Sequence, residues 1–105
     1  MEFTYNNPSE QIPAGISLDA PYVWQKSWGL GLDHAVTLYD QNSSLMDINE
    51  PIQWIVVQGN GHVETNAKGL LNYIPDNRDN VVILRAEVYG FSDTATIHMI
   101  DDMGV

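Results

Sequence analysis

The sequence predicts an all-β sandwich of about seven antiparallel strands, and three observations support this. Residues 82–89 and 94–99 each have an apolar residue at every second position, with mostly polar or larger side chains between them, as strands with one buried face do. Gly, Asn, Asp, Pro and Ser recur between the apolar runs and mark frequent turns. No apolar pattern with a helical period persists along the chain. Short strands separated by turns are typical of two packed β-sheets.

Domain organisation follows from length and composition. A chain of 105 residues has the size of one domain, and its 44% hydrophobic residues suffice for a core. Residues 1–15 are polar and include Pro8 and Pro13, so we expect an extended arm or linker there. We place the sandwich at residues 16–100 and a short acidic tail at residues 101–105.

The strands of the N-terminal half are predicted from short apolar runs. Ile16 and Leu18 predict a first strand, which ends before Pro21. Residues 34–39 predict another strand, and the polar residues 40–44 after it have the composition of a turn.

The C-terminal half contains the clearer strands. Residues 52–57 form an apolar run around Trp54. The alternating runs 82–89 and 94–99 come later and are joined by residues 90–93, which include a glycine. Because the connection is short, we expect these two runs to form an antiparallel hairpin.

Four large side chains are expected in the core of the sandwich. Trp54 would fill the space between the sheets, which pack about 10 Å apart. Tyr73 would bury its ring and keep its hydroxyl hydrogen-bonded at a strand end. Gly59 and Gly61 are expected to adopt positive φ in a tight connection. The predicted core residues are Trp54, Tyr73, Leu84 and Ile97.

Residues 52–100 carry the motifs of a known family. Trp54 lies in an apolar strand, a glycine-rich turn follows at residues 59–61, and residues 69–75 read Gly-Leu-Leu-Asn-Tyr-Ile-Pro. A strand then ends in an alanine-containing run, and Thr-Ala-Thr occurs at residues 94–96. This block resembles the bacterial immunoglobulin-like (Big) domains, which recur in bacterial surface adhesins and phage structural proteins. The resemblance covers about half of the chain and implies an immunoglobulin-like sandwich, with no particular ligand.

Charge is the strongest compositional deviation. Fourteen acidic residues against four basic ones give a formal net charge of -10. Such a field repels phosphate backbones and anionic membrane surfaces, so we expect neither nucleic-acid binding nor direct membrane insertion. No apolar run approaches the about 20 residues that span a bilayer. The chain has no cysteine, which excludes disulfides and thiolate metal sites.

The sequence contains no motif of a catalytic site. The Gly-x-Gly pairs at residues 29–31 and 59–61 lack the following helix and third glycine of a dinucleotide-binding loop. No G-x-S-x-G, H-E-x-x-H or P-loop motif occurs. His34, His62 and His98 have irregular spacings that do not suit a metal site. We therefore expect a protein that is not an enzyme and has no cofactor, with calcium binding as the alternative to be weighed.

Carboxylates in loops and at strand ends are the candidates for binding calcium. Oxygen ligands of this kind suit calcium, particularly at junctions between tandem sandwich domains. No fixed spacing such as that of an EF-hand loop is present, and solvated surface acids are the simpler interpretation. The candidate ligands are Asp19, Asp40, Asp101 and Asp102, and Asp47 and Glu50 lie in similar loops.

Tyr22, Trp24 and Trp28 are the most specific binding candidates. Their spacing places them on one face of an extended chain. Exposed aromatic rings in such a row stack on sugar rings or contact a protein partner. The alternative is burial of the same rings in the core, which we favour for Trp24.

These observations predict a non-catalytic structural or adhesive module. The family resemblance implies an extracellular location, on a bacterial cell surface or in a phage virion, as part of a larger protein. The expected partners are a protein or a cell-surface glycan, together with adjacent domains of the same chain. Two alternatives remain: a carbohydrate-binding module that uses Tyr22, Trp24 and Trp28, and a calcium-dependent junction between domains.

Overall fold

The computed structural model describes residues 10–101, and these residues form ten β-strands and no helix. Within them, no helix is long and apolar enough to cross a membrane. In chain order the strands are β1 (Pro13–Leu18), β2 (Val23–Gln25), β3 (Leu30–Gly31), β4 (Val36–Asp40), β5 (Leu45–Met46), β6 (Gln53–Gln58), β7 (His62–Thr65), β8 (Leu71–Ile74), β9 (Val81–Val88) and β10 (Phe91–Ile100).

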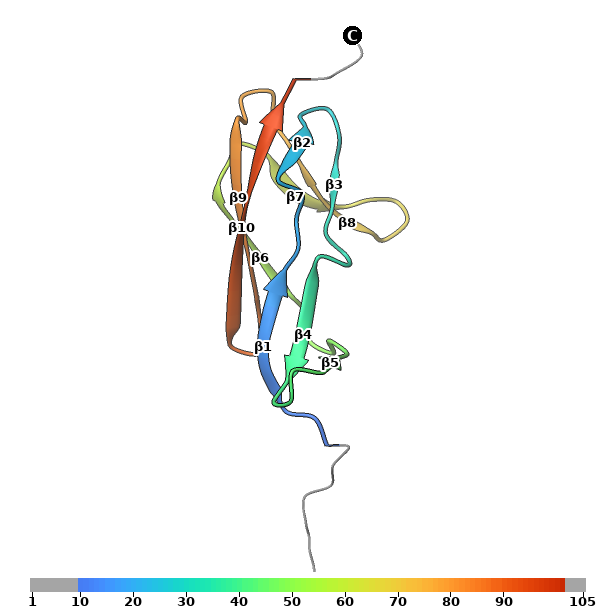
Figure 1. Ribbon diagram of the computed structural model, residues 1–105. Helices are drawn as coiled ribbons and strands as arrows, with labels where there is room; N and C mark the ends of the chain where they lie inside the picture. Colours follow the sequence, from blue (N-terminus) through green and yellow to red (C-terminus); the bar gives the residue numbers. More distant parts are fainter. Residues whose placement is uncertain (1–9, 102–105) are drawn as a thin grey trace, which may run out of the picture.

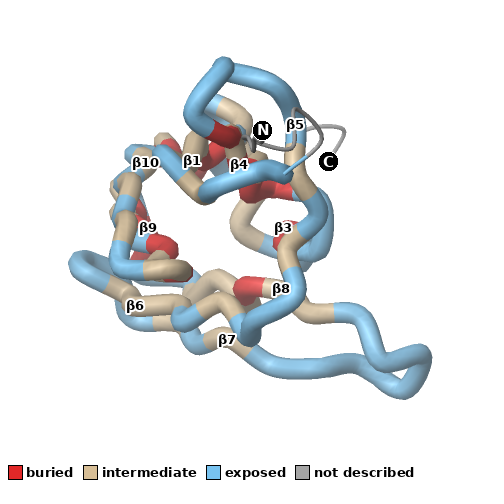
Figure 2. Tube along the Cα trace, turned by 90° about the horizontal axis from the view of Figure 1, so that it is seen from below, coloured by how far each residue is buried: buried red, intermediate tan, exposed pale blue. Residues whose placement is uncertain are grey.

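Two layers of strands enclose the core (Figure 1). One layer is the four-stranded sheet β2-β10-β9-β6. The other contains two smaller sheets, β1-β4-β5 and β3-β8-β7, which meet where β3 runs on into β4 (Figure 1). Viewed along the length of the molecule, the strands form a ring around the core (Figure 2). The predicted all-β sandwich is therefore confirmed.

The ten segments follow seven lines of chain, with β5 as a short addition. β1 and β2 are successive parts of the first line, β3 and β4 of the second, and the remaining five strands supply one line each. β1 pairs antiparallel with β4, whereas β2 pairs in parallel with β10 in the opposite layer. The resulting strand order matches the seven-stranded immunoglobulin sandwich of the constant type.

The first line of chain changes sheets between Leu18 and Tyr22. Pro21 lies at the change, where its lack of an N–H group prevents continued sheet pairing. The Leu18 backbone N donates a hydrogen bond to Asp93 Oδ2 at 2.8 Å, which ties the end of β1 to β10. Beyond Pro21, the Tyr22 carbonyl accepts a hydrogen bond from His98 N at 2.7 Å. This one segment therefore joins both layers.

The core consists of two apolar clusters, and Trp54 packs against both. Trp54 is itself only partly buried, but its position between the clusters is the one expected for a side chain that fills the gap between sheets. Tyr73, Leu84 and Ile97 are 0%, 1% and 0% exposed. The larger cluster contains Leu30, Leu32, Tyr73, Val82, Leu84, Ile97 and Met99, and the smaller contains Leu18, Ala35, Val36, Ala86 and Val88.

The expected hairpin is present, with a tighter turn than the sequence suggested. β9 and β10 pair antiparallel from Phe91↔Val88 to His98↔Val81. The turn residues are Tyr89 and Gly90, with φ of 54° and 81°, as in the two-residue turns that suit twisted hairpins. A positive φ is strained for tyrosine. The Tyr89 hydroxyl accepts a hydrogen bond from Asn49 N at 2.9 Å and helps to hold this conformation.

The N-terminal boundary of the sandwich differs from the expected one. β1 begins at Pro13, within the residues predicted to be an arm. The preceding residues are also attached: Gln41 Oε1 accepts a hydrogen bond from Ile12 N at 2.8 Å, and Gln41 Nε2 donates one to the Glu10 carbonyl at 3.1 Å. The side-chain amide of Gln41 thus pairs with the backbone as a neighbouring strand would. The expected segment at residues 1–9 lies outside the described residues.

Candidate functional site

A buried carboxylate organises the β6–β7 turn and the β8–β9 connection. Asp79 is 1% exposed and accepts four hydrogen bonds. Its Oδ1 accepts from Asn60 N at 2.6 Å and from Asn60 Nδ2 at 3.1 Å. Its Oδ2 accepts from the Tyr73 hydroxyl at 2.7 Å and from Asp76 N at 3.0 Å. We call Asn60, Gly61, Tyr73, Asp76 and Asp79 the Asp79 network.

Hydrogen bonding sets the charge state of the Asp79 network. Burial opposes ionisation of Asp79, but the N–H groups of Asp76 and Asn60 and the Tyr73 hydroxyl outweigh it and lower the pKa of Asp79 below its usual value. Burial and the hydrogen bond to Asp79 raise the pKa of Tyr73 to about 12. Asp79 is therefore a carboxylate and Tyr73 a neutral phenol across the neutral pH range, and the phenol donates its hydrogen bond to the carboxylate.

Glycine is required at two positions of this turn for different reasons. Gly59 has a φ of 150°, in the range expected for it. Gly61 does not have positive φ, which corrects the expectation from sequence. It is needed because a Cβ there would collide with the Ile74 carbonyl oxygen and lie 2.7 Å from the Tyr73 hydroxyl oxygen. The Gly61 N–H donates to that hydroxyl at 3.0 Å.

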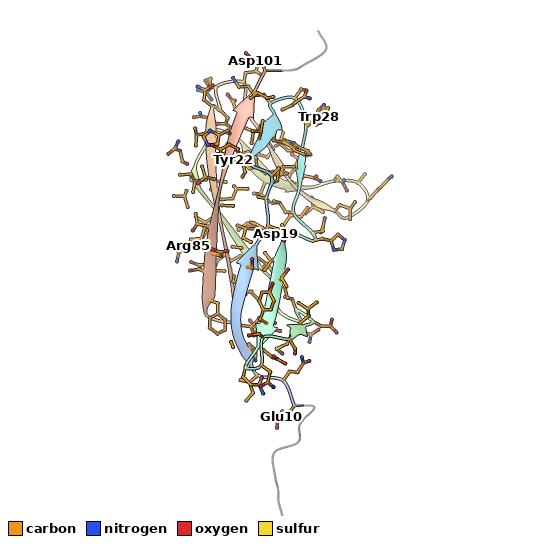
Figure 3. The ribbon with its side chains drawn as sticks, in the orientation of Figure 1. Glu10, Asp19, Tyr22, Trp28, Arg85 and Asp101 are labelled. Carbon is orange, nitrogen blue, oxygen red and sulfur yellow. The ribbon has the colours of Figure 1, made fainter. Side chains whose placement is uncertain are left out.

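The three aromatic candidates do not form a row: Trp24 and Trp28 contact each other, whereas Tyr22 lies apart from Trp28 (Figure 3). Trp24 lies opposite Met99 in the β2–β10 pairing and packs against the larger core cluster. Trp28 contacts Trp24 edge-on, with ring centroids 5.5 Å apart and planes at 74°, and its carbonyl accepts a hydrogen bond from Trp24 Nε1 at 3.2 Å. Tyr22 instead lies against His98, with centroids 4.5 Å apart. The chain turns after Gln25, where Gln25 O accepts from Trp28 N, so residue parity does not carry across the segment.

Exposed apolar side chains gather near the end of the molecule where the chain leaves β10. Tyr22 is 71% exposed, Trp28 51%, Val23 43% and Ile100 36%. These four residues, the β2 surface, lie on β2, the loops beside it and the last residue of β10. Exposed apolar side chains that lie close together are typical of contact surfaces, so the β2 surface is one candidate for contact with a partner.

The described acidic candidates for calcium are not brought together. Asp40 is 5% exposed, and its oxygens accept hydrogen bonds from Gln11 Nε2 at 2.9 Å and from the N–H groups of Asn42 and Ser44 at 2.8 Å. These bonds lower the pKa of Asp40, with that of Gln11 contributing most. Asp101 pairs with Lys26 Nζ at 3.3 Å, and Asp19 is exposed.

A site for a metal ion is not evident within residues 10–101, where no three His, Cys, Asp or Glu side chains converge. Asp102 lies outside the described residues. His62 Nε2 lies 2.7 Å from Glu64 Oε1 on the surface, and His98 contacts Tyr22. The oxygens of Asp40 accept hydrogen bonds that close the β4–β5 turn, whereas an oxygen that binds a cation must be free of such donors.

Sequence reasoning missed Asp79. It lies among the polar residues 76–80, whose composition is that of an ordinary exposed turn. Its nearest partners in space include Asn60, nineteen positions away along the chain. No local pattern distinguishes such a carboxylate from a solvated one, because its burial depends on two loops that meet only in the folded sandwich.

Comparisons with known proteins give a structural likeness alone. No protein-family model matches the chain, and no curated protein matches it. Among solved structures, the N-terminal part of the bacterial S-layer protein SbsC is similar, with a TM-score of 0.55 and 16% sequence identity. The alignment covers 87% of this chain and 21% of that one, so this chain corresponds to a small part of the S-layer structure. At this identity the likeness shows that the two share a fold.

Proposed function

We propose that this protein is a non-catalytic structural or adhesive module of a bacterial cell-surface or phage virion protein. It would act as a spacer between neighbouring domains and contact a protein partner through its surface. The observation that supports this most directly is the position of the first and last described residues. Glu10 lies at one end of the elongated sandwich and Asp101 at the other (Figure 3). Modules of this kind joined end to end form a linear array. The fold shared with part of an S-layer protein and the resemblance to Big domains agree with the proposal.

The pairing of β2 with β10 suits a module under tension. The two strands run in parallel, and a pull on the two ends of the chain moves them in opposite directions along their length. Their hydrogen bonds, such as Lys26 N to the Ile100 carbonyl at 3.0 Å, are then loaded together instead of one after another. The pair is reinforced by the ion pair of Lys26 with Asp101 and by inward packing of Trp24 and Met99.

A single-molecule force experiment tests this role. Tandem copies are pulled by their ends, and the wild type is compared with Lys26→Pro and Lys68→Pro. Each variant loses one backbone N–H donor. Lys26→Pro removes the bond from Lys26 N to the Ile100 carbonyl in the β2–β10 pair. Lys68→Pro removes the bond from Lys68 N to Asn66 Oδ1 in the β7–β8 turn. We expect a clear fall in unfolding force for Lys26→Pro and a smaller one for Lys68→Pro, after correction for equilibrium stability. Equal unfolding forces in all three proteins would contradict the idea that the β2–β10 pair resists the applied force.

The β2 surface supports contact with a protein more than stacking on a sugar. A sugar-binding platform needs rings in a common plane, whereas the planes of Trp24 and Trp28 are at 74° and the Tyr22 ring lies against His98 instead of against either tryptophan. We expect the tryptophan emission spectrum to stay unchanged during titration with a panel of soluble glycans. A saturable shift that disappears in Trp28→Ala would favour the carbohydrate-binding alternative instead.

The calcium-dependent junction stays a prediction with less support. Both oxygens of Asp40 accept hydrogen bonds, and Asp101 pairs with Lys26. A junction site would therefore need ligands from an adjacent domain, since within residues 10–101 no group of acidic side chains converges.

A further inference from the structure

The β6–β7 turn contains the one Asn-Gly pair of the sequence, Asn60–Gly61. Asparagine followed by glycine is the dipeptide most prone to deamidation, because glycine has no side chain to hinder attack by its own backbone nitrogen. Both residues are needed by the fold. Gly61 alone fits beside the Ile74 carbonyl and the Tyr73 hydroxyl, and Asn60 supplies two of the four donors to Asp79. The fold therefore keeps a chemically labile pair in place.

We propose that Asn60 is a site of deamidation. The Asp79 network protects Asn60 in the folded domain, and this protection is lost when the domain unfolds. In the reaction the Gly61 nitrogen loses its proton to a base from solvent and forms a bond to Asn60 Cγ. The bond from Cγ to Nδ2 breaks, and ammonia leaves with a proton from water. Water then opens the cyclic imide at either carbonyl, to give aspartate or isoaspartate at position 60. The net change is addition of one water and loss of one ammonia.

Protection follows from where the reacting atoms are held. The Gly61 nitrogen must give up its hydrogen bond to the Tyr73 hydroxyl before it can turn toward Asn60 Cγ. The Asn60 amide must leave Asp79 Oδ1, to which its Nδ2 donates at 3.1 Å. Tyr73 and Asp79 cannot follow these movements, because they are 0% and 1% exposed and are packed in the core. The hydrogen bonds thus hold the attacking nitrogen and the side-chain amide in positions from which the ring cannot close.

The product is incompatible with the network. A carboxylate at position 60 replaces the Nδ2 donor and lies against the ionised Asp79 Oδ1. Isoaspartate also adds one carbon to the backbone of a turn in which Gly61 has no spare room. A domain that has reacted while unfolded is therefore expected to refold poorly, so the modification records time spent unfolded.

The first test compares folded and unfolded wild type. Samples are incubated at mildly alkaline pH in buffer or in concentrated urea, and the peptide that contains Asn60 is followed by mass spectrometry with isoaspartate detection. We expect the folded protein to react at least about tenfold more slowly, the factor that corresponds to loss of one or two hydrogen bonds. Equal rates in the two samples would overturn the proposal.

The second test separates local protection from global stability. Tyr73→Phe removes the hydroxyl that accepts a hydrogen bond from Gly61 N. The control is Tyr89→Phe, in the turn after β9, which removes the hydroxyl that accepts a hydrogen bond from Asn49 N. Under conditions in which circular dichroism shows both variants folded, we expect several-fold faster reaction at Asn60 in Tyr73→Phe alone. An unchanged or slower rate in folded Tyr73→Phe contradicts protection by this network. If Tyr73→Phe does not fold, the comparison of folded with unfolded wild type decides.

Discussion

Gly61→Ala is expected to destabilise the domain by about 4 kcal/mol or more, and thereby to prevent stable folding. The added methyl group would collide with a backbone atom, the Ile74 carbonyl oxygen, and would lie 2.9 Å from Tyr73 Cζ. A flexible side chain could move away, but this carbonyl belongs to β8 and the tyrosine ring is 0% exposed in the core. Urea denaturation followed by tryptophan fluorescence measures the effect.

Gly15→Ala is the matched control for this substitution. Gly15 lies in β1, and a Cβ built there meets no atom within 4 Å. We expect the free energy of unfolding of Gly15→Ala to stay within about 0.5 kcal/mol of the wild type. If Gly61→Ala behaved like this control, the close approach of the β6–β7 turn to β8 would not exist in solution.

Asp79→Ala is expected to lower the free energy of unfolding by about 3 kcal/mol. The change leaves the Tyr73 hydroxyl and the N–H groups of Asn60 and Asp76 without their common acceptor. Buried donors without partners are more costly than an average hydrogen bond is stabilising. Asp76→Ala serves as the control, because it keeps the backbone N–H that Asp76 donates to Asp79 and removes only the side-chain bonds of Asp76 to Arg78, which is exposed. Exposed ion pairs of this kind contribute about 1 kcal/mol or less. Equal losses in the two variants would contradict a special role for Asp79.

The same network predicts how stability depends on pH. The lowered pKa of Asp79 contributes stability that is present above the unfolded value, near 3.9, and is lost as the pH falls through the folded value. The raised pKa of Tyr73 contributes stability that is present below the unfolded value, about 10, and is lost as the pH rises toward 12. Thermal melts across both limits should show a weaker acid dependence in Asp79→Asn and a weaker alkaline dependence in Tyr73→Phe. If the melting temperatures of both variants change with pH as that of the wild type does, other groups determine the pH dependence of stability.

The strands that the sequence predicted well have one buried face along their whole length. β9 and β10 follow a period of two because their inward side chains enter the core and their outward ones face solvent. β2, β3 and β5 have only two or three residues each, too few for any period to be recognised. β2 also belongs to a segment that changes sheets, and this is why residue parity misplaced the aromatic side chains.

Candidate sites were harder to predict than strands, and the acidic residues show why. Asp40 and Asp79 are buried and hydrogen-bonded, whereas Asp19 is exposed, yet all three look alike in the sequence. Asp40 accepts a hydrogen bond from Gln11, and Asp79 accepts one from Asn60. In both pairs the donor is far from the carboxylate along the chain. Whether a carboxylate binds a cation, caps a turn or stays in solvent depends on such long-range partners, which composition and spacing do not reveal.

The Gln41 amide changes the reach of the module within a larger chain. Because Gln41 pairs with the backbone of Glu10 and Ile12, the rigid body starts at Glu10 and not at Ile16, where the sequence placed it. An extended chain spans about 3.4 Å per residue, so the tether to a domain fused on this side is shorter by six residues, or about 20 Å of extended chain. A shorter tether restricts the angles between neighbours and raises their effective concentration for each other.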